Sequence, residues 1–300
     1  MSGATISRRA FGRFLRQIRE GAGKTALAAG LEIEVSRQTL LRMEDGLSTK
    51  IATSQFRDLL AFYGVADATR EEALSLWDEV KEQAKAAQLQ GNSRGFWRPY
   101  ADQYEAHFPH YLRLETSARI VTTHQMILVP GLLQTSDYRK GVIHIDGPAV
   151  SAVDLERRIE LTAQRQARID EEGFLLKVLL SEAVLNHRPA DGAAMSAQLR
   201  WLAEVGQRPN VSIRVIRFDS GVHRGLTAQS FTMLEFPKLA NGFVDPSVVY
   251  VEGAQGVGIY HERDDVVGKF ETTISALCEV ALTERETRDL VTQYAKEYAA

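Results

Sequence analysis

The sequence predicts two domains of different fold class: a mainly α-helical N-terminal domain, and an α+β C-terminal domain with a mixed sheet of about five strands. Apolar residues recur every three and four positions up to Gly64, as in amphipathic helices. After Gly173 they form short continuous or alternating runs typical of strands. Charge divides in the same way, because residues 1–64 hold ten Lys/Arg and six Asp/Glu although the whole chain carries −3.

Two short helices joined by a tight turn are expected between Thr25 and Glu44. Thr25 and Ser36 carry hydroxyl groups that can cap the free N–H groups at a helix start. Leu40 and Met43 lie three residues apart and should anchor the second helix inward. Further helices are expected on both sides, from the i, i+3, i+4, i+7 spacing of Phe11, Phe14, Leu15 and Ile18, and from the similar spacing of Phe56, Leu59, Leu60 and Tyr63.

The second helix of this pair, 36–44, has the composition of a DNA recognition helix. Arg and Gln carry paired hydrogen-bonding groups that match the guanine and adenine edges in the major groove. We therefore expect Arg37, Gln38 and Thr39 to read bases. Thr25, Arg42 and Lys50 are expected to contact phosphate and set the register. The predicted DNA-binding residues are Thr25, Ser36, Arg37, Gln38, Thr39, Arg42 and Lys50. A plain helical bundle with an incidental basic face is the alternative.

The segments 14–19, 22–25 and 35–46 resemble the Cro/repressor-like (XRE-type) helix-turn-helix regulators. Two positions depart from that family's pattern. Glu34 stands where the turn usually has Gly, and Gly30 stands where the family usually has Ala. Since Glu lacks the left-handed backbone freedom of Gly, we expect a local difference in the turn.

The excess positive charge of residues 1–64 is only +4, which favours binding as a homodimer because two copies double the phosphate contacts. A two-fold dimer requires a palindromic site in double-stranded DNA, with half-sites one turn (~34 Å) apart. The remainder of the chain carries −7, which is typical of a domain that does not bind DNA itself.

A connector helix is expected at Glu71–Leu89, opened by a capping box at Thr69–Glu72 and followed by a hinge at 90–93. Its apolar stripe should pack within the chain, with a dimer mate as the alternative. The expected domains are 1–68 (helix-turn-helix, DNA-binding), 69–93 (connector and hinge) and 94–300 (α+β partner, effector or dimerisation domain).

In the C-terminal domain the periodicity predicts a set of helices and strands. Helices are expected at 100–116, 136–144, 151–172, around 195–205, over 266–280 and after Thr283, and strands at 120–128, 174–180, 211–216, 230–236, 247–251 and 256–260. In the helix 151–172 the inner line is expected to be Leu155, Ile159 and Ala163. A basic band on the same helix consists of Arg157, Arg158, Arg165 and Arg168. It is expected to be a solvated face, and contact with DNA phosphate or an acidic partner is the alternative.

Residues 94–293 also resemble a known domain through Leu128–Thr135, in which Val-Pro-Gly-Leu-Leu-Gln-Thr at 129–135 is the most specific match. Shorter matching pieces lie at 96–97, 208–211, 221–223, 231–236 and 248–252. This is the domain of unassigned function that follows the helix-turn-helix in a large group of actinomycete regulators, often called antitoxin-like. The resemblance implies a small co-encoded partner protein.

No set of residues predicts catalysis, a metal site or a cofactor. The seven histidines are scattered without an HExxH pairing, there is no nucleophile elbow, and Cys278 is the single cysteine. The loop 220–225, which is expected to be flexible, suggests a candidate effector pocket formed by His223, Arg224 and Glu252, although an ordinary surface loop is the alternative. We therefore expect a protein that is not an enzyme.

The sequence as a whole predicts a cytoplasmic, nucleoid-associated transcriptional regulator. It contains no apolar run long enough to span a membrane and no secretory signal. An antitoxin-like protein is the alternative, in which the C-terminal domain sequesters a small partner and DNA binding is autoregulatory.

Overall fold

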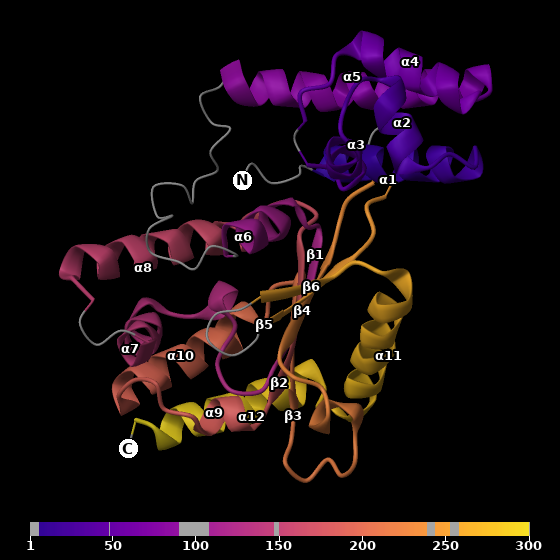
Figure 1. The fold of residues 1–300 in the computed structure, drawn as a ribbon. Coiled ribbons are helices and arrows are strands. Elements are labelled where there is room, and N and C mark those ends of the chain that lie inside the picture. The colour runs from indigo at the N-terminus through magenta and orange to yellow at the C-terminus, as the bar shows by residue number, and fades with distance from the viewer. Residues whose placement is uncertain are drawn as a thin grey trace. The chain divides into compact units, whose positions relative to one another are not determined.

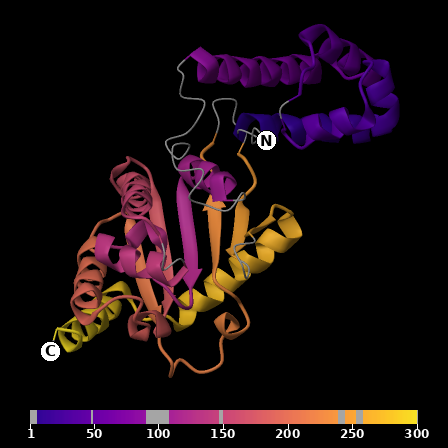
Figure 2. The same ribbon diagram turned by 60° about the vertical axis from the view of Figure 1, so that its left-hand side comes forward.

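The computed structural model describes residues 6–47, 49–89, 108–146, 150–238, 244–252 and 258–299. It confirms the predicted fold class, with a helical N-terminal part and an α+β C-terminal part built on a mixed sheet (Figures 1 and 2). The chain divides into two compact units. One comprises Met1–Gly95 with Lys238–Asp245, and the other comprises Phe96–Pro237 with Pro246–Ala300.

The N-terminal unit contains five helices in its described residues: α1 (Ile6–Gly21), α2 (Ala26–Glu32), α3 (Arg37–Glu44), α4 (Thr53–Tyr63) and α5 (Asp67–Leu89). All five contribute to one apolar core, in which the rings of Phe11, Phe56 and Trp77 lie 5.1–5.2 Å apart, centre to centre. The predicted packing of the connector helix within the chain is therefore confirmed.

The predicted start of that connector helix is wrong. Helix α5 begins at Asp67, so Thr69 lies inside its first turn and does not cap it. Asp67 places a carboxylate at the positive end of the helix dipole, which favours the earlier start.

The C-terminal unit is organised around a six-stranded sheet in the order β3-β2-β1-β4-β5-β6. Strands β1 (Ile120–Gln125), β2 (Leu175–Ser181) and β3 (Val211–Ile216) pair in parallel. The other three pair antiparallel, and they are β4 (Phe231–Glu235), β5 (Val248–Glu252) and β6 (Gly258–His261). Each strand lies within a segment that the sequence periodicity predicted, apart from one or two residues at the ends.

Helices lie on both sides of this sheet (Figure 1). Helix α11 (Asp264–Val280) packs on one face through Leu277, which contacts apolar side chains of β2 and β3. The remaining helical segments are α6 (Phe108–Ser117), η2 (Gly131–Leu133), α7 (Ser136–Asp146), α8 (Ala152–Gln166), η3 (Ala167–Asp170), α9 (Ala183–Asn186), α10 (Gly192–Val205), η4 (Arg224–Leu226) and α12 (Glu284–Glu297). Residues 100–107 of the predicted helix at 100–116 lie outside the described residues, and so do the hinge expected at 90–93 and the first two residues of the strand expected at 256–260.

The predicted inner face of α8 is wrong. The helix buries Leu161, Thr162 and Arg165, whereas Ala163 is exposed and Leu155 and Ile159 are only partly buried.

The basic band predicted on the same helix is not a solvated face either, because Arg165 and Arg168 are buried. Both guanidinium groups bind Glu115. Arg165 donates two hydrogen bonds of 2.8 Å to its carboxylate, and Arg168 donates to its backbone carbonyl. Glu115, fifty residues before Arg165, thus draws one arginine inward through its carboxylate and the other through its backbone carbonyl, which periodicity alone does not reveal.

The motif segment Val129–Thr135 forms a turn that other side chains hold in place. Gln166 of α8 donates a hydrogen bond of 3.2 Å to the carbonyl of Gly131. Gln198 of α10 donates one of 2.7 Å to the carbonyl of Leu133. The most specific motif of this domain therefore joins two helices at the end of β1.

No helix among the described residues is both long and apolar enough to cross a membrane.

Candidate nucleic-acid interface

The two predicted helix caps are present around α2 and α3. The Thr25 hydroxyl oxygen accepts a hydrogen bond of 3.1 Å from the N–H of Ala28, and Ser36 does the same for Thr39 at 3.1 Å. Each cap satisfies one N–H group that the helix itself leaves unpaired. Both helices therefore begin immediately after the residues that the sequence indicated.

The turn between α2 and α3 keeps its left-handed residue although that residue is not glycine. Glu34 has φ = 56° and is the one described non-glycine residue with positive φ. Gly30 lets the following chain approach closely, since a Cβ there would lie 2.8 Å from the carbonyl oxygen of Val35. Of the two departures from the family pattern, Glu34 in the turn adds backbone strain, and Gly30 in α2 leaves room for the chain that follows the turn.

Helix α3 has one buried face and one exposed face. Leu40 and Met43 are buried in the core of the unit. The side chains of Arg37, Gln38 and Arg42 are exposed, and none of them makes a hydrogen bond or ion pair with another described residue. Their donor groups are therefore free to bind an external ligand.

The remaining predicted contacts differ in availability. Thr25 and Lys50 are exposed, whereas Thr39 is partly buried. The hydroxyl groups of Thr39 and Ser36 lie 2.9 Å apart and share a hydrogen bond. Arg37 and Gln38 are therefore better placed than Thr39 to reach bases. The DNA contacts themselves remain predictions.

The C-terminal end of α3 is anchored by a buried carboxylate that sequence reasoning did not single out. The Glu44 side chain is fully buried and accepts hydrogen bonds of 2.6 and 2.9 Å from Arg19 on α1. Arg16 contributes a third bond of 3.3 Å, and it also donates to Asp45 at 2.6 Å. Hydrogen bonding to Glu44 raises the pKa of Arg19.

Helices α1 and α3 also approach very closely beside this anchor. A Cβ on Gly12 would lie 2.4 Å from the carbonyl oxygen of Glu44, so only glycine fits there. The sequence signal for the anchor is the spacing of Arg16 and Arg19, which places two guanidinium groups on one side of α1.

Among the described residues, no hydrogen bond or ion pair joins the side chains of the predicted effector pocket to one another. His223 accepts a hydrogen bond of 3.1 Å from the backbone N–H of Gly225 and so caps the short helix η4. Arg224 and Glu252 are exposed. Their role in effector binding remains a prediction.

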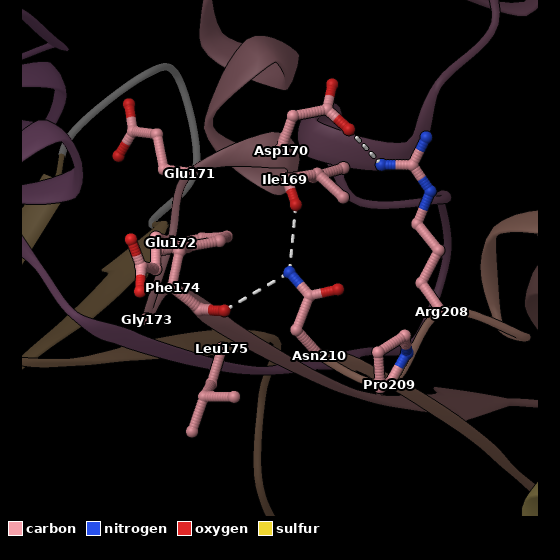
Figure 3. A pocket seen from close by; sticks show the side chains of 10 residues that line it. All are labelled: Ile169, Asp170, Glu171, Glu172, Gly173, Phe174, Leu175, Arg208, Pro209 and Asn210. Atoms are coloured by element: carbon pink, nitrogen blue, oxygen red, sulfur yellow. Dashed lines mark hydrogen bonds and ion pairs between the residues drawn. The ribbon is translucent and has the colours of Figure 1, made fainter.

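An open pocket between η3 and the start of β3 has its polar groups engaged within the chain (Figure 3). Asn210 donates hydrogen bonds of 2.8 and 3.2 Å to the carbonyl oxygens of Ile169 and Phe174. Arg208 pairs with Asp170 across the pocket. These interactions hold the loop before β2 against β3, which gives the Arg-Pro-Asn segment at 208–210 a structural role.

Comparison with known protein families assigns both parts of the chain. Residues 108–293 match the model of a domain of unknown function, DUF5753. Residues 10–73 match the model of a helix-turn-helix domain. No curated protein and no solved structure matches the chain.

Proposed function

We propose, from the premise that this chain belongs to the DUF5753 family and begins with a helix-turn-helix domain, that it is a sequence-specific transcriptional regulator. The helix-turn-helix match supports DNA binding in general. The finer proposal is that the protein binds a palindromic operator as a homodimer, with its C-terminal domain binding a partner or an effector.

The observation that carries this proposal is the rigid presentation of Arg37 and Gln38. Both side chains are exposed in the first turn of α3, without partners among the described residues. The opposite face of the helix is fixed by apolar packing and by the buried Glu44. Because α3 is already held in place, DNA binding does not have to order the helix. Bidentate contacts from Arg37 and Gln38 to guanine or adenine therefore become favourable.

The homodimer follows from charge and symmetry. An excess of four positive charges in residues 1–64 supports few phosphate contacts for one copy, and two copies double them. Two α3 helices related by a two-fold axis would occupy major grooves about one turn apart. The resulting protein is expected to be cytoplasmic and associated with the nucleoid.

Genome-wide DNA occupancy of the intact protein tests the proposal. We expect discrete palindromic sites that disappear in the Arg37→Ala/Gln38→Ala variant. Arg57→Ala is the matched control, because Arg57 is an exposed arginine on the neighbouring helix α4 and its replacement also removes one positive charge. Occupancy unchanged in the double variant, or lost equally in the control, would contradict sequence reading by α3.

An antitoxin-like role is the second proposal, supported by the family resemblance of residues 94–293. In this case the C-terminal domain sequesters a small co-encoded protein. Purification from the native host separates the two proposals, since a stoichiometric small protein favours sequestration and a homodimer alone argues against it.

We also propose that the protein acts by binding and not by catalysis, because its seven histidines and single cysteine form no catalytic pattern in the sequence. Hydrolase activity of the pure protein that is lost in His223→Ala or Glu252→Ala would refute this proposal.

A further inference from the structure

Large apolar side chains are exposed at one edge of the C-terminal sheet. Strands β1, β2 and β3 are parallel, so their carboxyl ends lie at the same edge, and the loop 217–230 connects β3 to β4 there (Figure 1). In this loop Phe218 is 68% exposed, Val222 96% and Leu226 62%. Three large apolar side chains are thus exposed within nine residues of one loop, and exposed apolar side chains gathered in this way offer a partner surface to cover.

Hydrogen bonds hold this loop in a defined conformation. The backbone N–H of Phe218 donates to the buried carboxylate of Glu182 at 2.8 Å, and the Tyr294 hydroxyl donates to the same carboxylate at 3.1 Å. Within the loop, the backbone N–H groups of Thr227 and Ala228 both donate to the carbonyl of Arg224 at 3.2 Å. The loop is therefore ordered with its apolar side chains outside, so a partner would not have to order it.

The charges of the loop indicate the character of that partner. Arg217 pairs with Asp219 at 3.0 Å, whereas the exposed Arg224 has no ion pair with another described residue. Arg224 lies between Val222 and Leu226 in the chain. A partner surface that covers both apolar side chains would therefore complement the positive charge of Arg224 if it placed a carboxylate opposite that residue.

We propose that the loop 217–230 is the docking surface for a protein partner that presents an apolar groove bordered by Asp or Glu carboxylates. This inference rests on the part of the proposed function in which the C-terminal domain binds a partner protein, and it names the site. Val222 and Leu226 would enter the groove, and Arg224 would pair at its border.

Photo-crosslinking in cells of the native host identifies what covers the loop. A benzophenone amino acid, p-benzoylphenylalanine, replaces Val222 in the full chain, and in a control it replaces Val153, which is 69% exposed at the start of α8. We expect one protein crosslinked through position 222 and not through 153, with the crosslinked segment rich in apolar residues and carboxylates. No crosslink, a crosslink to a second copy of this chain or to DNA, or equal capture from both positions would overturn the proposal.

Binding of the purified captured protein then tests the chemistry. Val222→Ser/Leu226→Ser should weaken its affinity roughly 30-fold or more, as for buried apolar residues at the centre of an interface. Arg224→Glu should weaken it as well, and reversal of the facing carboxylate to Lys should restore it. Val153→Ser is the matched control, and the same loss in that variant would refute the assignment.

Operator binding separates a failure of this inference from a failure of the regulator proposal. The loop variants should bind operator DNA as the unaltered protein does, because the loop belongs to the C-terminal unit. A protein that docks its partner but occupies no DNA sites would refute only the regulator proposal. A protein that occupies its sites but shows no crosslink at position 222 would refute only the docking surface.

Discussion

Replacement of the buried carboxylate Glu44 by an amide tests whether this carboxylate anchors the recognition helix. In the unaltered protein, the two carboxylate oxygens of Glu44 accept three hydrogen bonds from arginines. Glu44→Gln replaces one of these oxygens by an NH₂ donor, while Arg19 stays charged and largely buried. The breaking of a buried ion pair from one side costs about 3–5 kcal/mol. Since domains are stable by only about 5–15 kcal/mol, the N-terminal unit should lose a large share of its stability.

Urea unfolding followed by Trp77 fluorescence measures this loss, because Trp77 is buried in the core of the N-terminal unit. A Trp97→Phe/Trp201→Phe background leaves Trp77 as the single tryptophan. Glu20→Gln is the matched control, since the Glu20 side chain is 61% exposed and pairs with the same Arg19 at 3.3 Å. An exposed pair of this kind contributes about 0–1 kcal/mol.

A cost for Glu44→Gln below about 1 kcal/mol, or one no larger than that of Glu20→Gln, would refute the anchoring role of Glu44. Operator affinity, measured where both variants are still folded, gives a second readout. We expect it to fall in Glu44→Gln and to be retained in Glu20→Gln, because the first change loosens α3 on α1.

Further predictions concern the turn, the base contacts and a buried histidine. Glu34→Gly should raise the free energy of unfolding by about 1 kcal/mol by relieving the positive φ, as measured by urea unfolding; no gain would show that the turn is not strained. Gly30→Ala should lower it by about 1–3 kcal/mol, because the new Cβ meets the carbonyl oxygen of Val35, and an unchanged midpoint would show that the turn can shift. Arg37→Ala should weaken operator binding by about 1–3 kcal/mol and relax base preference at one position per half-site, whereas an equal loss on all sequences would identify a phosphate contact. Burial lowers the pKa of His124, so the unfolded chain binds a proton at this residue more readily than the folded chain. The free energy of unfolding should therefore fall as the pH decreases below about 6.5. His124→Gln should flatten this dependence in unfolding measured at several pH values, and an unaltered slope would refute the prediction.

The candidate site divides into parts that sequence reasoning reached and parts that it did not. The caps Thr25 and Ser36 and the exposed Arg37 and Gln38 were predictable, because a cap acts on an N–H group only three residues away. The anchor at Glu44 was not, because its partner Arg19 lies 25 residues earlier on another helix. Only the packed unit brings them together.

The sequence by itself determined the fold class, the order of helices and strands and the helix-turn-helix, since periodicity and capping are local properties. The tertiary structure decided which polar residues are inside. In α8 the periodicity indicated a face through Leu155 and Ala163, but Glu115 draws Arg165 inward and rotates the buried face. A charged side chain is buried only where a partner compensates its desolvation, and that partner is a property of the folded chain and not of the neighbouring sequence.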